Sequence, residues 1–224
     1  ENPPRAKSIT LVFLLITLVI LVITGYMAKL DGKDERISDR RGLLRVAVCF
    51  WGVNRALPRT VGSIDKNIFG PLQKHQVAYD VFFHTYSLQK ITSKWAHEEA
   101  IPIPGATDEL RKLRHRGHLV RHEVTDQAEF DRLTNLSSFI APSGWDQNVV
   151  LNVLRSMNSL QRVTSLWLRE IDDRAAPFYY SQIIYLRPDL LYMTRLDVSL
   201  LLSLKADDFL TPNWGQFGGM NDRL

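Results

Sequence analysis

The chain has 224 residues, of which 45% are hydrophobic and 23% charged, a composition typical of a folded domain and not of a disordered chain. Its formal net charge of +4 suits anionic ligands such as phosphates or lipid headgroups but does not require nucleic acid as a partner. The only cysteine, Cys49, lies in an apolar run, which predicts a core residue and excludes both an intrachain disulfide and a cysteine-rich zinc site.

The stretch 8–28, SITLVFLLITLVILVITGYMA, carries no charge and is bounded by Lys7 and Lys29. As a helix rising about 1.5 Å per residue it would span roughly 30 Å, the thickness of the bilayer hydrocarbon. It is too long for the apolar core of a cleaved signal peptide, and it lacks the polar stripe of a buried soluble helix. We therefore predict a tail at 1–7, a transmembrane signal-anchor in the lipid bilayer at 8–28 and a charged stem at 29–44.

The orientation of this anchor is not decided by charge. Basic residues are more numerous after the apolar stretch than before it, which by the positive-inside rule favours a cytoplasmic domain. The sequon NLS at Asn135 favours a lumenal domain instead. Both orientations stay open on these grounds.

The globular part, 45–224, begins with a strand, helix, strand pattern. The apolar run 44–52 predicts a buried strand, 53–75 has helical spacing, and 79–86 predicts a second buried strand. The expected helix has an apolar face made of Val61, Ile64, Ile68, Phe69 and Leu72. Such a unit is typical of a parallel sheet with right-handed crossovers.

The remainder continues the alternation after a middle part, 87–145, that has no clear assignment. Residues 146–172 have helical spacing and 178–192 predict another strand. Residues 198–210 predict a short helix or an edge strand, followed by a glycine-rich loop at 211–224. Together these elements favour an α/β domain whose mainly parallel sheet is flanked by helices.

Ligands of parallel sheets bind outside the carboxyl ends of the strands, and polar residues gather there in this sequence. Gly52 and Arg55 follow the first expected strand, where a backbone turn and a guanidinium suit a phosphate. Asp189 is the first candidate ligand for a divalent cation, and Asp197 the second if the chain turns between them. The alternative is a structural ion pair between Arg187 and Asp189, with Arg55 as a solvated loop residue.

The basic stretch RKLRHRGHLVRH at 111–122 is either a solvated face or a binding site for an anionic acceptor or lipid headgroups. The motifs GxSxG, GxxxxGK[ST], GxGxxG and HExxH are absent from the sequence. The absence of the first three argues against α/β-hydrolases, P-loop enzymes and dinucleotide binders of the usual kind, and the histidines have no clear metal-binding spacing.

Five blocks occur in a fixed order over most of 45–224: VAVCFWGVNRALPRTVGSIDKNIFGPL, YDVFFHTY, NVLRSMNSLQRVTSLW, YLRPDLLY and PNWGQFGGMNDRL. They resemble membrane-anchored glycosyltransferase-like proteins, similar in pattern to lipopolysaccharide- and capsule-type transferases of GT-A fold. The resemblance implies a GT-A-like (Rossmann-like) sheet and a glycosyltransferase of hexosyltransferase type. Its donor substrate would be a nucleotide-diphosphate sugar, and its acceptor a glycan, lipid or protein. It also implies a type II membrane protein of the Golgi or ER with a lumenal domain.

The resemblance also implies roles for particular residues. The R-x-D of Arg187 and Asp189 stands where the family usually has a metal-binding D-x-D, which implies Mn²⁺ or Mg²⁺ at Asp189. Gly52 and Arg55 correspond to the nucleotide-facing first loop. The final block lines the donor or acceptor side, through Phe217, Gly218, Gly219, Asn221, Asp222 and Arg223. Asp222 is the candidate catalytic base.

This sequence departs from the family pattern in two respects. It has no true D-x-D, which leaves the metal dependence open. Family members also continue with further acceptor-binding elements, so we expect a domain truncated at its carboxyl end. Two other functions stay open: a catalytically inactive membrane-tethered module that binds glycan or protein partners, and a cytoplasmic-facing transferase acting on lipid-linked sugars.

Overall fold

The computed structural model describes residues 44–93, 98–103, 119–138, 147–174, 178–205 and 207–210. The predicted tail, anchor and nearly all of the stem lie outside these residues, as does the glycine-rich loop. Within the described ranges, no helix has the length and apolar character needed to cross a membrane. Backbone contacts divide the chain into two units, Glu1–Gly42 with Arg132–Leu154 and Leu43–Asp131 with Arg155–Leu224.

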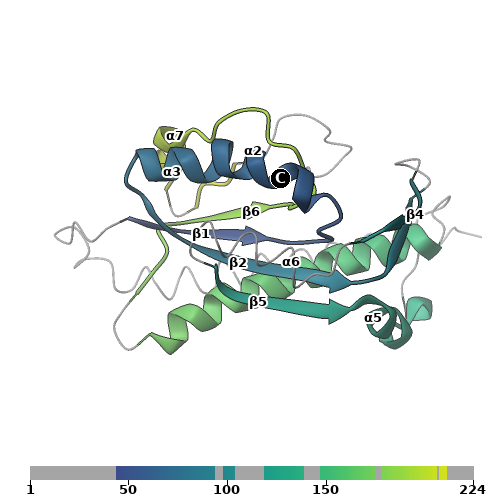
Figure 1. The fold of residues 1–224 in the computed structure, drawn as a ribbon. Coiled ribbons are helices and arrows are strands. Elements are labelled where there is room, and N and C mark those ends of the chain that lie inside the picture. Colours follow the sequence, from purple (N-terminus) through teal and green to yellow (C-terminus); the bar gives the residue numbers. More distant parts are fainter. Residues whose placement is uncertain are drawn as a thin grey trace, which may run out of the picture. The chain divides into compact units, whose positions relative to one another are not determined.

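The second unit is built on a four-stranded sheet in the order β5-β2-β1-β6 (Figure 1). Its strands are β1 (Arg45–Phe50), β2 (Ala78–Ser87), β5 (Leu119–Asp126) and β6 (Gln182–Leu186). All three pairings are parallel. The predicted α/β architecture with a parallel sheet flanked by helices is therefore confirmed for this unit. A separate antiparallel pair is formed by β3 (Lys90–Ser93) and β4 (Glu98–Pro102).

One face of the sheet is covered by three consecutive helical segments, α2 (Leu57–Ile64), the π-helix η2 (Asp65–Phe69) and α3 (Gly70–Lys74), and by α7 (Val198–Ser203) (Figure 1). Alternate residues of β1 point to this face, as the period of two in a strand requires. The core on this side joins the strands to the predicted helix face, and its members include Val46, Val48, Phe50, Leu57, Ile64, Ile68, Phe69, Leu72, Val81, Phe83, Val198 and Leu201.

The opposite face is covered by α6 (Gln147–Asp173), a long helix that runs behind the sheet in Figure 1. The other residues of β1, Ala47 and Cys49, pack here against Val163 and Leu166. Cys49 is fully buried, as predicted, and burial raises the pKa of its thiol well above the usual value. A thiol in this state is inert as a nucleophile.

The helices of the two layers lead the chain to strands on opposite sides of β1. The chain passes from β1 to β2 through α2, η2 and α3, and from β5 to β6 through α6 on the other face. The connections therefore diverge between the neighbouring strands β1 and β6. In open α/β sheets, the crevice at such a switch point is where ligands bind.

One expectation needs correction. The strand predicted at 178–192 is limited to β6, because the chain turns at 188–190. Pro188 has no N–H to donate to a sheet, so a strand is not continued through it. The unassigned middle contains β5, which forms one edge of the sheet, and the short helix α5 (Gln127–Leu133). Of the two alternatives for 198–210, the helix is the correct one.

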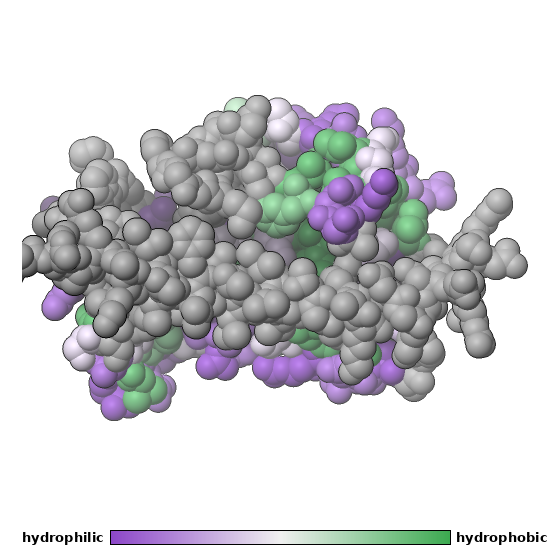
Figure 2. All heavy atoms as spheres, turned by 180° about the vertical axis from the view of Figure 1, so that it is seen from behind, coloured by the Kyte–Doolittle hydropathy of each residue, from purple (hydrophilic) through white to green (hydrophobic). Residues whose placement is uncertain are grey.

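Apolar side chains remain exposed after β6 and on α7, namely Leu191, Met193, Leu200, Phe209 and Leu210. Figure 2 shows apolar surface on the side where α7 lies. In the first unit, η3 (Leu136–Ser138) follows the exposed Asn135, whose Oδ1 accepts hydrogen bonds from the Ser137 amide at 3.2 Å and hydroxyl at 2.6 Å.

Candidate functional site

The loop after β1 forms the first wall of the site. Gly52 has a φ of +94°, a conformation that side chains with a Cβ rarely adopt. Its N–H donates to Ser159 Oγ on α6 at 2.7 Å, and the Trp51 N–H donates to the Leu186 carbonyl of β6 at 3.0 Å. The turn is therefore fixed both to the neighbouring strand and to the helix behind the sheet.

The loop after β6 brings an acidic side chain to two arginines. Arg55 Nε donates to Asp189 Oδ2 at 3.0 Å, while Arg187 donates to Oδ1 through Nε at 3.0 Å and to Oδ2 through Nη2 at 3.1 Å. The Asp189 side chain is 1% exposed, whereas those of Arg55 and Arg187 are 28% and 21% exposed. The carboxylate is thus buried beneath two guanidinium groups that reach solvent. We call Arg55, Arg187 and Asp189 the carboxyl-edge cluster.

A polar stripe on α2 and η2 holds the turn that carries Asp189. Thr60 Oγ1 donates to the Pro188 carbonyl at 2.6 Å, and the Tyr192 N–H donates to Ser63 Oγ at 3.1 Å. Asn67 Nδ2 donates to the Tyr192 carbonyl at 2.6 Å. None of these three polar residues was among the predicted site residues. The signal of the stripe was present, because the three polar residues recur at helical spacing beside an apolar face.

Tyr192 closes the same turn from the other side. Its hydroxyl donates to the Arg187 carbonyl at 2.9 Å and accepts from the Arg187 N–H at 3.1 Å. Burial raises the pKa of Tyr192, so the phenol keeps its proton and its donor role at neutral pH. The backbone of Arg187 is therefore held independently of the guanidinium.

A buried histidine lies beside the first loop, near the end of β2. His84 Nδ1 is 2.7 Å from Ser159 Oγ, and Nε2 is 2.9 Å from Thr125 Oγ1 of β5. Burial, with a smaller contribution from the positive charge of Arg162, lowers the pKa of His84 to about 4. The imidazole is therefore neutral at physiological pH and links β2 and β5 to the helix residue that holds Gly52.

Two buried donors near the first loop have no hydrogen-bond partner among the described residues, Trp51 Nε1 and Asn54 Nδ2. Asn54 is fully buried, and its Oδ1 accepts from Thr85 Oγ1 at 3.4 Å. An unsatisfied buried donor costs about 1–3 kcal/mol, so few persist in folded proteins without a purpose. Both lie at the carboxyl edge of β1, where an acceptor from a ligand or a water would offset that cost.

The structure thus brings together four of the predicted site residues, Gly52, Arg55, Arg187 and Asp189. A Cβ built on Gly52 would lie 3.9 Å from Arg187 Cζ, which shows how closely the two loops approach. Asp197 has another partner, because its Oδ1 accepts from Leu200 N at 2.9 Å as the N-cap of α7. The predicted residues Gly218, Gly219, Asn221 and Asp222 lie outside the described residues.

The described residues do not fit a divalent cation at this site. Mg²⁺ and Mn²⁺ need carboxylate oxygens that face them, whereas both oxygens of Asp189 accept hydrogen bonds from guanidinium groups. The two guanidinium charges beside this carboxylate also disfavour a further cation there. Within the described ranges, no group of three or more His, Cys, Asp or Glu side chains is placed to hold a metal. The cation and its ligands Asp189 and Asp197 stay a prediction.

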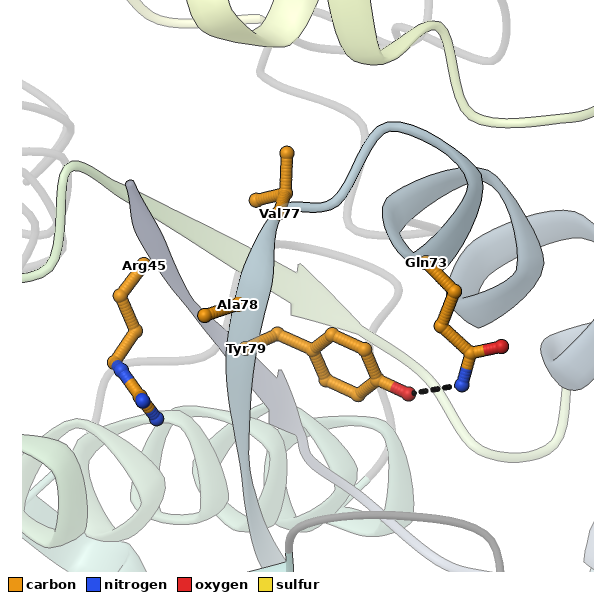
Figure 3. Close-up of a pocket in the computed structure, with 5 residues that line it drawn as sticks. All are labelled: Arg45, Gln73, Val77, Ala78 and Tyr79. Atoms are coloured by element: carbon orange, nitrogen blue, oxygen red, sulfur yellow. Dashed lines mark hydrogen bonds between the residues drawn. The ribbon is translucent and has the colours of Figure 1, made fainter. Parts of the chain in front are cut away.

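A hollow of about 190 Å³ lies at the opposite edge, beside the amino ends of β1 and β2. Figure 3 shows Arg45 on one side of β2, and Tyr79 with its hydrogen-bond donor Gln73 on the other. Arg45 is paired with the buried Asp80 at 2.6 Å. The described residues that line the hollow include no group of side chains arranged for catalysis. We therefore place the candidate site at the carboxyl edge.

Comparison of the chain with protein-family models, with curated proteins and with solved structures finds no match.

Proposed function

We propose that the domain is a membrane-anchored glycosyltransferase that moves a sugar from a nucleotide-diphosphate sugar to a glycan, lipid or protein acceptor. The proposal includes a GT-A-like arrangement of the sheet. The observation that carries it is the pair of guanidinium groups at the switch point between β1 and β6, in contact with one buried carboxylate. Ligands of open α/β sheets bind at this place, and arginine is the side chain best suited to phosphate.

The chemistry explains why two arginines are useful here. Cleavage of the glycosidic bond of the donor leaves a nucleoside diphosphate that gains negative charge as the bond breaks. Positive groups held in place before the reaction stabilise that charge without reorganisation. Asp189, the α2–η2 stripe and Tyr192 supply this preorganisation, because they fix the Arg187 backbone and side chain. Asp222 remains our candidate for the base that accepts a proton from the acceptor.

We also propose the membrane anchor at 8–28 and a lumenal domain in the Golgi or ER. Asn135 is exposed, as an acceptor of N-glycosylation has to be. The cytoplasmic-facing orientation is the alternative that the basic residues after the anchor favour.

The proposal is tested by the thermal stability of the full chain in detergent, with a panel of nucleoside diphosphates. A ligand at a hundredfold excess over its Kd adds about 2.7 kcal/mol to the free energy of unfolding. For a domain of this size, that raises Tm by several degrees. The nucleoside diphosphate that stabilises most then identifies the sugar donors for a turnover assay, in which release of the nucleoside diphosphate is measured.

The results separate the two candidate functions. Stabilisation with turnover supports the transferase. Stabilisation without turnover, over a range of sugars and acceptors, supports the inactive binding module. The observation that favours this alternative is that Asp189 is engaged in ion pairs with Arg55 and Arg187. No stabilisation of a folded protein by any nucleoside diphosphate contradicts the proposed site.

A further inference from the structure

We infer that the diphosphate of the donor is held by the guanidinium groups of Arg55 and Arg187 without a divalent cation, and that Asp189 is a positioning residue for both. This inference rests on the proposed function. The R-x-D pattern predicted Asp189 as a metal ligand. In this inference its carboxylate instead orients the guanidinium groups of Arg55 and Arg187.

The carboxylate of Asp189 is occupied by hydrogen bonds from arginine. A metal-binding carboxylate directs lone pairs at the ion, but the oxygens of Asp189 accept three hydrogen bonds from two arginines. Its side chain is 1% exposed and lies below those of Arg55 and Arg187, which are 28% and 21% exposed. A ligand arriving from solvent would therefore meet guanidinium before it met carboxylate.

The charges at the cluster also suit an anion. Among the described residues, two guanidinium groups lie against one carboxylate. Planar groups of this kind bind phosphoryl oxygens with two parallel hydrogen bonds, which combines charge with orientation. A diphosphate has enough oxygens to engage both.

The two arginines are held in place by the protein. A site without a metal ion needs this, because it must position its positive charges itself. Arg187 contacts three separate supports: Asp189 through its side chain, Tyr192 through its backbone and the ring of Trp51, whose centroid is 5.4 Å from Cζ. Arg55 is fixed by the same carboxylate. Neither guanidinium depends on a metal for its position.

The orphaned donors support a ligand at the same edge. Trp51 Nε1 and Asn54 Nδ2 come from the segment that also carries Arg55, and neither has an acceptor within the part of the chain that the structure describes. A phosphorylated nucleoside is rich in acceptor oxygens. A metal ion, in contrast, satisfies no N–H donor.

The experiment measures the Kd of the best-binding nucleoside diphosphate on the full chain in detergent, in EDTA and in Mn²⁺. We expect the two values to agree within about twofold. Arg55→Gln and Arg187→Gln should each weaken binding by about tenfold to a hundredfold in both buffers, the usual effect of losing charge-assisted hydrogen bonds. Arg169→Gln is the matched control, because Arg169 is exposed on α6 one residue from Glu170, which binds Arg121 and Arg174 away from the site.

Asp189→Asn tests the positioning role. It should weaken binding equally in EDTA and in Mn²⁺, leaving the ratio of the two Kd values near one. If Asp189 were a metal ligand, the wild-type ratio would be large and the substitution would bring it towards one. Asp189→Glu keeps a carboxylate between the two arginines and should retain more binding than Asp189→Asn, a rescue that a merely structural loss would not show.

Inorganic pyrophosphate provides a test that needs no variant. It should displace the nucleoside diphosphate from the wild-type chain in EDTA. Binding that requires Mn²⁺, or that pyrophosphate in EDTA does not displace, overturns the inference and leaves the proposed function standing. Absence of binding in both buffers overturns the inference together with the proposed function.

Discussion

The domain contains two similar ion clusters at opposite edges of its sheet. At the carboxyl edge, Asp189 is held by Arg55 and Arg187. At the amino edge, the buried Asp80 of β2 accepts from Arg45 at 2.6 Å and from Arg174 at 3.0 Å. The exposures are also similar, with the side chain of Asp80 at 4% and those of its two arginines near one third.

Their surroundings differ. The amino-edge cluster is centred on the strand residues Arg45 and Asp80, with Arg174 directly after α6. It is completed by Tyr180, whose hydroxyl donates to Asp80 Oδ2 at 2.8 Å, and by Phe178, whose ring centroid is 3.8 Å from Arg174 Cζ. The carboxyl-edge cluster lies on two loops, beside a glycine at positive φ. An Arg–Asp–Arg group is therefore not in itself a sign of function. Its position relative to the ends of the strands distinguishes the two.

The largest expected effect comes from removing each central carboxylate in turn. Asp80→Asn and Asp189→Asn each leave two guanidinium groups without their buried partner, so each should lower the free energy of unfolding by about 3–5 kcal/mol. Urea denaturation measures this loss. Only Asp189→Asn should also weaken nucleoside-diphosphate binding by the folded protein. Equal loss of binding in both variants would show that the two clusters do not differ in function.

The next effect concerns the buried imidazole, which belongs to the carboxyl edge alone. The folded pKa of His84 is about 4, against an ordinary value of 6.5. Between these values the unfolded chain binds a proton that the folded chain does not, so stability is lost as the pH falls from 6.5 towards 4. The loss should reach about 3 kcal/mol.

This pH dependence is measured by thermal unfolding between pH 7 and about pH 4. His84→Gln should flatten the profile, whereas His75→Gln should not, because His75 is exposed. An unchanged profile in His84→Gln would place the acid sensitivity elsewhere in the chain.

The smallest expected effect tests whether Asp197 belongs to the carboxyl-edge site. As the N-cap of α7 it should contribute about 1 kcal/mol, lost in Asp197→Ala and largely kept in Asp197→Ser, since serine also caps helices. Neither variant should alter the response of nucleotide binding to Mn²⁺. A loss of Mn²⁺ dependence in Asp197→Ser would restore the metal-ligand role predicted from the sequence.

The sequence was sufficient for the elements whose pattern is strong. A continuous apolar run predicts β1, and helical spacing predicts the α2–α3 face, because both patterns reflect burial. The gathering of polar residues after β1 and β6 at one edge followed from the rule for parallel strands, whereas the contact of Arg55 with Asp189 was not predicted. The order of the strands was not predicted, because no local pattern encodes which strands become neighbours.

Two parts of the site were missed for physical reasons. Ser159 lies on the core-facing side of a long amphipathic helix, where a small polar residue resembles a packing residue until its partners are known. β5 was missed because its residues facing α6 are polar or charged: Arg121 pairs with Glu170, and Glu123 with Arg162. A strand held by ion pairs has no apolar alternation on that face to reveal it.

The pairing of β1 with β6 has a consequence for biosynthesis. The residues that meet across this pair, such as Arg55 and Asp189, are 134 positions apart in the chain. On the ribosome, β1 and β2 can associate early, but the other side of β1 stays unpaired until β6 has been made. An apolar strand with an open edge is a template for aggregation, and contacts over such long separations form slowly. Interrupted synthesis before β6 would therefore leave β5, β2 and β1 as a partial sheet with one apolar edge open, and we expect the nascent chain to depend on chaperones until β6 is in place.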